Sequence, residues 1–164
     1  MTETCETEDF GRPELAAYGL DLAYRVWSEA RPENRSLPAR ADIDIVLFKD
    51  MLSRLTLYDV IEGGYDFRYR VHSTESAAAI GQERTGMRRS EIDQPPEMAA
   101  RMNERLRRVV ASRRPLLSRL PSQTGIPPLF VTRLFLPLAT EEAVVDMILV
   151  VREATGRYLL RPYL

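Results

Sequence analysis

Hydrophobic and polar residues alternate in two neighbouring segments, at residues 55–60 (LTLYDV) and 67–72 (FRYRVH). Alternation of this kind is typical of β-strands, because successive side chains of a strand point to opposite faces of the sheet. Gly63 and Gly64 lie between the two segments and allow the positive φ angles of a tight turn. The pattern therefore predicts a β-hairpin, in which Tyr69 belongs to the apolar face of the second strand.

Apolar residues recur every three or four positions after Pro13, which places them on one side of a helix. We predict one helix that runs to about residue 30, followed by a linker that ends at residue 35. Its apolar stripe consists of Leu15, Tyr18, Leu22 and Val26. The stripe has two interpretations. It covers the sheet of its own chain, or it pairs with the same helix of a second chain and forms a homodimer.

The longest helix is predicted between Pro96 and about Ser112, because proline suits a first helical turn. Its apolar residues follow helical spacing and are Met98, Met102, Leu106, Val109 and Val110. The arginines on and just after this helix are interpreted as a solvent-exposed surface, since Glu104 interrupts them and no aromatic residues lie between them. They are Arg101, Arg105, Arg107, Arg108, Arg113 and Arg114.

Three further apolar segments, at residues 116–120, 129–138 and 143–151, are predicted strands. Two strands, a block of helices and three strands together predict an α+β domain, in which one face of a small sheet is covered by helices. The expected organisation has four parts. They are an acidic, disordered N-terminus (1–12), the N-terminal helix and linker (13–35), the α+β domain (36–153) and a C-terminal tail (154–164).

Composition narrows the classes of function. The chain has 164 residues, of which 45% are hydrophobic and 29% charged, as expected for one globular domain. A net charge of −1 predicts no binding to nucleic acid or to anionic membranes. No secretory signal is recognisable at the N-terminus, and no apolar run approaches the ~20 residues that span a bilayer. Cys5 is the only cysteine, so no disulfide forms within one chain, and we expect a cytoplasmic protein.

Few residues suit metal or acid–base chemistry. His72 and Cys5 are too few nitrogen and sulfur ligands for zinc, so no metal site is expected. We interpret His72 as a pocket-edge residue that makes one hydrogen bond; the alternative is a polar anchor that responds to pH. Because a guanidinium binds carboxylates bidentately, Arg70, Arg88 and Arg133 are candidates for holding a carboxylate ligand, with surface salt bridges as the alternative.

From Leu37 to about Glu153 the chain resembles a family of short, stand-alone bacterial PAS-domain proteins. The resemblance rests on an ordered set of segments: LPARADID, LTLYDV, FRYRV, IGQERTGM, RRPLL after the long helix, RLFLPLA and VVDMILVV. It implies a PAS-like five-stranded antiparallel sheet with helices on one face, and often dimerisation through an N-terminal helix. It also implies signal sensing or protein interaction, not catalysis. The chain departs from the family at Ile45, where proline is common, and at residues 72–73, where glycine is usual.

PAS domains sometimes hold haem or flavin. Haem sensors of this fold usually place an axial histidine on the long helix, and light sensors use a cysteine in the helical segment. This chain has neither residue at those places. We therefore expect no cofactor, and we interpret Met98 and Met102 as core residues and not as haem ligands.

Three functions are compatible with the sequence. The favoured one is a cytoplasmic sensor that binds a small apolar or amphipathic metabolite between the sheet and the long helix. Binding then favours one arrangement of the N-terminal helix or dimer, which an unknown signalling protein recognises. The expected pocket residues are Tyr69, His72, Met98, Met102, Leu106, Phe130, Arg133, Leu134 and Met147.

The first alternative is a ligand-free protein–protein interaction module, which would lack a cavity of at least ~300 Å³. The second, ranked last, is a curved-sheet isomerase or dehydratase. Such an enzyme needs an ionisable group in an apolar pocket, for which His72, Asp146 or a tyrosine is the candidate.

Overall fold

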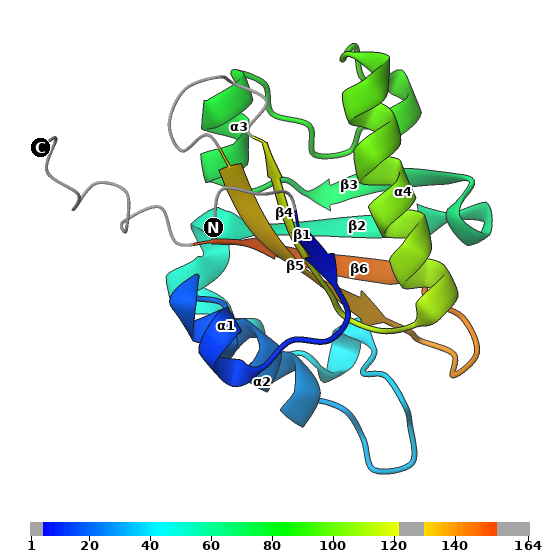
Figure 1. The fold of residues 1–164 in the computed structure, drawn as a ribbon. Coiled ribbons are helices and arrows are strands. Elements are labelled where there is room, and N and C mark those ends of the chain that lie inside the picture. The colour runs from blue at the N-terminus through cyan, green and yellow to red at the C-terminus, as the bar shows by residue number, and fades with distance from the viewer. Residues whose placement is uncertain (1–4, 122–129, 154–164) are drawn as a thin grey trace, which may run out of the picture.

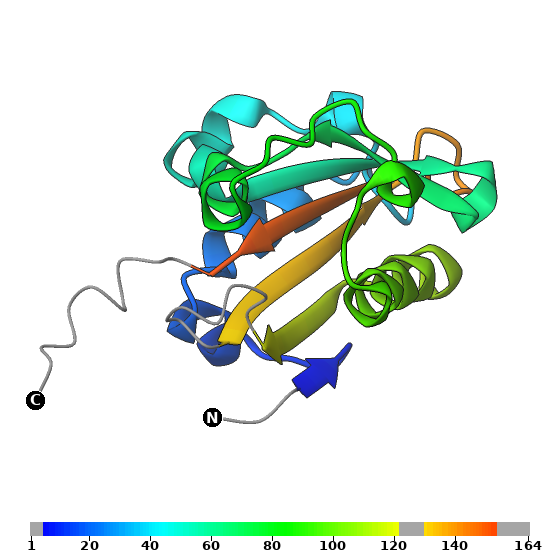
Figure 2. The same ribbon diagram turned by 90° about the horizontal axis from the view of Figure 1, so that it is seen from above.

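The computed structural model describes residues 5–121 and 130–153. The strands within these residues form a six-stranded antiparallel sheet (Figure 1). The strands are β1 (Cys5–Thr7), β2 (Leu55–Ile61), β3 (Asp66–Val71), β4 (Leu116–Pro121), β5 (Phe130–Leu138) and β6 (Met147–Arg152). Their order across the sheet is β1-β4-β5-β6-β2-β3. Seen from above, β1 lies beside β4 at one edge and the β2–β3 hairpin lies at the other (Figure 2). The α+β class is confirmed, as is the predicted succession of two strands, helices and three strands along the chain from β2 to β6, and β1 adds one strand to the five expected.

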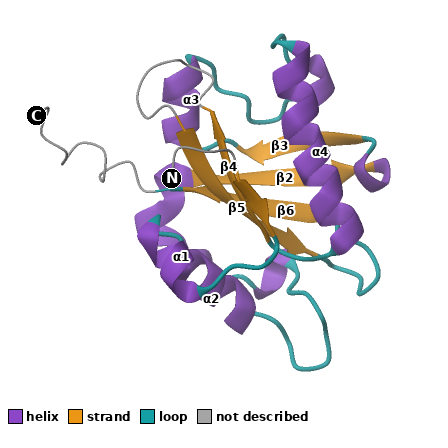
Figure 3. Ribbon diagram, viewed as in Figure 1, coloured by secondary structure: helices purple, strands orange, loops and turns teal. Residues whose placement is uncertain are grey.

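Along the chain, the described helices lie between β1 and β4 (Figure 3). The α-helices are α1 (Arg12–Ala17), α2 (Asp21–Glu29), α3 (Thr74–Ile80) and α4 (Pro96–Ser112). The 3-10 helices are η1 (Arg40–Asp42), η2 (Ile45–Arg54), η3 (Glu62–Gly64) and η4 (Arg89–Glu91). The hairpin glycines behave as predicted, since Gly63 and Gly64 have φ angles of 66° and 106°.

The N-terminal helix is two helices, so the prediction of a single one was wrong. Gly19 has a φ of 68°, which ends α1, and the Leu20 N–H donates to the Leu15 carbonyl at 2.9 Å. The break turns Leu20 inwards as well as the predicted Leu15, and both are almost fully buried. In α2, the Trp27 Nε1–H donates to the carbonyl of Pro137 in β5 at 2.8 Å.

These contacts agree with the interpretation that the helix covers its own sheet. Val26 is buried in the same chain, whereas Tyr18 and Leu22 are partly exposed. A homodimer through this stripe is not tested by the single chain.

The acidic N-terminus was predicted to be disordered, and for residues 5–12 this was wrong. Residues 5–7 pair with β4, whose edge would otherwise present unpaired backbone groups. Charge adds to the pairing, because Glu6 binds Arg105 and Arg108 of α4, and Glu8 lies 2.9 Å from Arg108. Arg105 and Arg108, which were predicted to belong to a solvent-exposed surface, therefore bind the N-terminal segment instead. We call these ion pairs with Glu6 and Glu8 the N-terminal clamp.

Helices cover both faces of the sheet, whereas the sequence predicted one helical layer and left the place of the N-terminal helix open. Residues paired across antiparallel strands share a face, so the register assigns each side chain. The face that packs against α3 and α4, here called the α4 face, includes Thr56, Tyr58, Tyr69, Ser118, Arg133, Val150 and Arg152. The opposite face, covered by α1, α2 and η2, includes Leu55, Leu57, Phe130, Leu134, Leu138, Met147 and Leu149.

Candidate functional site

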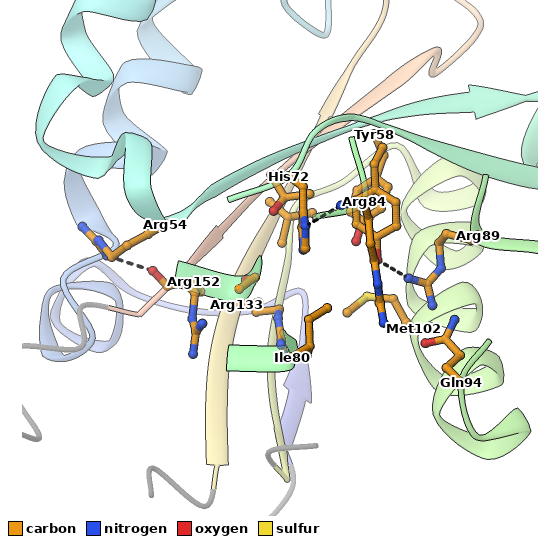
Figure 4. A pocket seen from close by; sticks show the side chains of 14 residues that line it. Arg54, Tyr58, His72, Ile80, Arg84, Arg89, Gln94, Met102, Arg133 and Arg152 are labelled. Carbon is orange, nitrogen blue, oxygen red and sulfur yellow. Dashed lines mark hydrogen bonds between the residues drawn. The ribbon is translucent and has the colours of Figure 1, made fainter. Parts of the chain in front are cut away.

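A cavity of about 60 Å³ lies between the α4 face of the sheet and the helices α3 and α4. Figure 4 shows the side chains that line it. Five of them are arginines: Arg54, Arg84, Arg89, Arg133 and Arg152. Among the described residues, no aspartate or glutamate lines the cavity. The site is therefore rich in fixed positive charge and hydrogen-bond donors.

Tyr69, in the middle of β3, is the polar centre of the cavity. Its hydroxyl oxygen accepts from Arg89 Nη1 at 2.8 Å and lies 3.5 Å from Arg84 Nη1. Tyr58 lies on the neighbouring strand, and the centre of its ring is 4.7 Å from the centre of the Tyr69 ring. Burial alone would raise the pKa of Tyr69, but the charge of Arg89 and hydrogen bonds from Tyr58 and Arg84 lower it. Burial raises the pKa of Tyr58, which remains a neutral donor.

The loop between α3 and α4 positions two of the arginines by pairing with the open edge of β3. The Tyr69 N–H donates to the Met87 carbonyl at 3.0 Å, and the Gly86 N–H donates to the Tyr69 carbonyl at 2.6 Å. Gly86 has a φ of 86°, which this tight turn requires. The turn brings Arg84 and Arg89 over the Tyr69 hydroxyl, and both arginines are at least nine-tenths buried.

Side-chain amides hold both guanidinium groups in place. Arg89 Nε donates to Asn103 Oδ1 at 2.6 Å, and Arg84 Nε donates to Gln82 Oε1 at 3.1 Å. These partners are neutral, so they orient the two charges without balancing them.

Arg133 and Arg152 are directly opposite each other on β5 and β6. Like charges in this position repel, and none of the described salt bridges includes either residue. Burial, followed by the charge of Arg152, lowers the pKa of Arg133 to about 10. Burial also lowers the pKa of Arg54, although Glu75 opposes part of the effect. The cavity thus holds guanidinium charges that few carboxylates offset.

His72 contributes a neutral ring. Its Nδ1 accepts from the backbone N–H of Arg84 at 3.2 Å, so this nitrogen carries no proton. Burial lowers the pKa of His72, and the nearby charge of Glu83 only partly opposes this. Although Glu83 Oε1 lies 3.6 Å from Nδ1, the contact is not an ion pair while the ring is neutral. His72 therefore adds a donor and no charge near neutral pH.

Several polar atoms of the cavity have no partner. Of six such buried side-chain atoms among the described residues, four belong to cavity-lining residues. They are Arg89 Nη2, Arg152 Nε, and both Gln94 Oε1 and Gln94 Nε2. Buried polar groups are nearly always hydrogen-bonded, so this concentration in one place marks a binding site for something polar.

The structure brings together four of the predicted pocket residues, which are Tyr69, His72, Met102 and Arg133. Met98 lines a smaller hollow of about 30 Å³ that it shares with Met102 and Arg133. Leu106 is fully buried one turn further along α4 and belongs to the core.

The other three predicted pocket residues are Phe130, Leu134 and Met147, and placing them in this cavity was wrong. The strand register puts them on the face opposite α4. Phe130 instead packs against the guanidinium of Arg119, whose Cζ atom lies 5.1 Å from the centre of the Phe130 ring. A strand that is buried on both faces gives no alternation from which to choose the correct face.

Sequence reasoning also missed most of the arginines. Arg70, a predicted ligand-binding candidate, is exposed and pairs with Asp59 at 2.7 Å. Arg88 forms an isolated backbone bridge with Arg68 outside the cavity lining. Arg84 and Arg89 belong to the same short segment as Arg88, and nothing in its sequence distinguishes an inward arginine from an outward one.

Within the described ranges, no group of three histidine, cysteine, aspartate or glutamate residues could hold a metal ion. None of the described helices is long and apolar enough to cross a membrane. Comparison with known proteins found no matching family model, no matching curated protein and no matching solved structure.

Proposed function

We propose that this chain is a PAS-like regulatory module that senses a small anion in the cavity beneath α4. The observation that carries the proposal is the set of five cavity arginines with no carboxylate among the lining residues described. Two strands, helices and three strands in sequence, with α3 and α4 over the cavity, support the PAS-like assignment. The proposal includes no catalytic step.

An anion fits this cavity better than the apolar metabolite expected from the sequence. Buried charges are costly unless they are paired, so an incoming anion would relieve repulsion among guanidinium groups. The volume of about 60 Å³ is well below the ~300 Å³ at which metabolite-sized pockets begin. The proposed ligand is therefore an ion of a few atoms.

A route from the cavity to the N-terminus supports a signalling role. Met102 of α4 lines the cavity, and Arg105 lies one turn further along the same helix. Arg105 donates to Ser118 Oγ in β4 at 2.9 Å and pairs with Glu6 in β1. A ligand that favours one position of α4 would thus alter the hold on β1 and, through it, the N-terminal helices or a dimer.

The proposal is tested by titrating the purified protein with sodium salts of acetate, nitrate and phosphate, using calorimetry and thermal unfolding. We expect at least one anion to bind with 1:1 stoichiometry and to raise the unfolding temperature. The Arg133→Met variant should lose this binding, whereas the exposed control Arg70→Met should keep it. Absence of saturable binding by every anion, including the lactate series below, would refute the proposal.

A sensing role, as opposed to simple binding, requires a second measurement. Hydrogen exchange of the β1 and β4 amides should change when the cavity is filled. Binding without any change outside the cavity would leave an anion-binding protein and remove the signalling part of the proposal.

A ligand-free interaction module is the second candidate, and the small size of the cavity favours it. Native mass spectrometry separates the two. A released stoichiometric anion supports the sensor, and an empty homodimer that ignores every anion supports the interaction module.

A further inference from the structure

Among the cavity residues described with unpartnered buried atoms, Gln94 differs from Arg89 and Arg152 because it needs two kinds of partner. Both its amide nitrogen and its amide oxygen are buried without a hydrogen-bond partner. The nitrogen requires an acceptor and the oxygen requires a donor. A bare carboxylate or nitrate supplies only acceptors, so neither would satisfy the oxygen. A hydroxyl group is both donor and acceptor and satisfies either atom.

The unpartnered arginine atoms require only hydrogen-bond acceptors. Arg152 Nε and Arg89 Nη2 are guanidinium nitrogens, which only donate. Figure 4 shows Arg133 and Arg152 on one side of the labelled group, with Arg89 and Gln94 on the other. A ligand that satisfies both sides therefore has an anionic end and a hydroxyl end.

Size and apolar contact restrict the ligand further. A water-sized atom occupies at least ~10–15 Å³ of such a volume, so a cavity of about 60 Å³ holds roughly four to six non-hydrogen atoms. The side chains of Ile80, Met102 and Arg84 lie between the two polar sides (Figure 4). The apolar surface of Ile80 and Met102 suits a short carbon segment.

We propose that the ligand is a short hydroxycarboxylate, of the size of glycolate or lactate. Its carboxylate binds the guanidinium groups of Arg133 and Arg152, and its hydroxyl binds the side-chain amide of Gln94 and Arg89 Nη2. The inference rests on the proposed anion-binding function and adds the chemical class of the ligand. It makes Gln94 the residue that distinguishes a hydroxy acid from the corresponding plain acid.

Two ligand pairs that differ by one hydroxyl test the inference directly. Glycolate is compared with acetate, and lactate with propionate, by calorimetry at constant pH and ionic strength. We expect each hydroxy acid to bind about tenfold or more tightly than its partner, because the plain acid leaves Gln94 unsatisfied. Phosphate and nitrate serve as inorganic competitors and should bind more weakly than lactate.

The Gln94→Leu variant identifies the residue responsible. It should bind acetate about as well as the unmodified chain does, while its preference for glycolate falls to less than about threefold. Removing two unsatisfied buried atoms should also leave its unfolding temperature unchanged or higher, which excludes misfolding as the cause. Asp93→Asn, an exposed change in the same loop, is the matched control and should keep the full preference.

The possible outcomes separate the two proposals. If none of the anions binds, the proposed function itself fails. If acids bind but hydroxy and plain acids bind equally, or if phosphate binds more tightly than lactate, only the hydroxycarboxylate inference fails. If the preference survives in Gln94→Leu, the assignment of the hydroxyl to Gln94 is wrong.

Discussion

Replacing Arg133 with methionine should stabilise the empty protein, although it removes a charged side chain from the site. The ordinary pKa of an arginine is 12.5, and burial beside Arg152 lowers that of Arg133 to about 10. One pKa unit corresponds to about 1.4 kcal/mol, so keeping this guanidinium charged costs the folded state about 3 kcal/mol. The cost is present at every pH below about 10, where the side chain is charged in both states.

Arg133 retains some exposure as a residue, and water will screen part of this cost. We therefore expect Arg133→Met to raise the free energy of unfolding by about 1–3 kcal/mol, which corresponds to about 3–9 °C in a chain of this length. The assay is urea unfolding, followed by circular dichroism, in a buffer free of phosphate and small carboxylates. Such anions would otherwise stabilise the unmodified protein and hide the difference.

The same variant should respond differently to ligand. An anion at 100 times its dissociation constant would add about 2.7 kcal/mol to the unmodified protein and almost nothing to Arg133→Met. The control Arg70→Met removes an exposed arginine paired with Asp59 and should change stability by less than about 1 kcal/mol. If Arg133→Met is less stable than the unmodified protein in anion-free buffer, Arg133 has a counter-charge and the reasoning is refuted.

Three further predictions concern pH, the N-terminal clamp and the core. Because the pKa of His72 is lowered in the folded state, stability should fall as pH drops from about 6.5 towards that lower value, and His72→Asn should flatten this part of the urea-stability profile. Glu6→Gln should cost about 1–3 kcal/mol and speed β1 amide exchange, because it leaves buried Arg105 unpaired; an equal effect from Asp9→Asn, which is 98% exposed, would contradict the clamp. Leu106→Ala should lower stability by about 2–5 kcal/mol in urea, and a loss below about 1 kcal/mol would show that this site is not packed.

Local sequence patterns predicted the main helices and strands of the α+β domain. Alternation and turn glycines predicted the β2–β3 hairpin, and helical spacing after Pro96 predicted α4 with Leu106 in its buried stripe. These features depend on residues close together in the chain, whose geometry is set by the backbone itself.

The place of β1 and the break at Gly19 could not be predicted in the same way. A three-residue strand has almost no pattern of its own, and it forms because β4 offers an open edge and α4 offers arginines for Glu6. The glycine at position 19 is compatible with a continuous helix in sequence, and packing of Leu20 and Trp27 on the sheet favours the break.

The same distinction applies to the candidate site, where local sequence patterns predicted some of the residues and the tertiary structure brought the others together. By itself, the amino-acid sequence determined that β3 would carry Tyr69 inwards, that α4 would present Met102, and that a single histidine and cysteine would provide little metal chemistry. Only the tertiary structure decided that Arg54, Arg84, Arg89, Arg133 and Arg152 converge on one cavity, because they come from four separate segments, which are η2, the loop between α3 and α4, β5 and β6. It also decided that Leu134 faces away from α4, since β5 is apolar on both sides and only its neighbours fix its orientation.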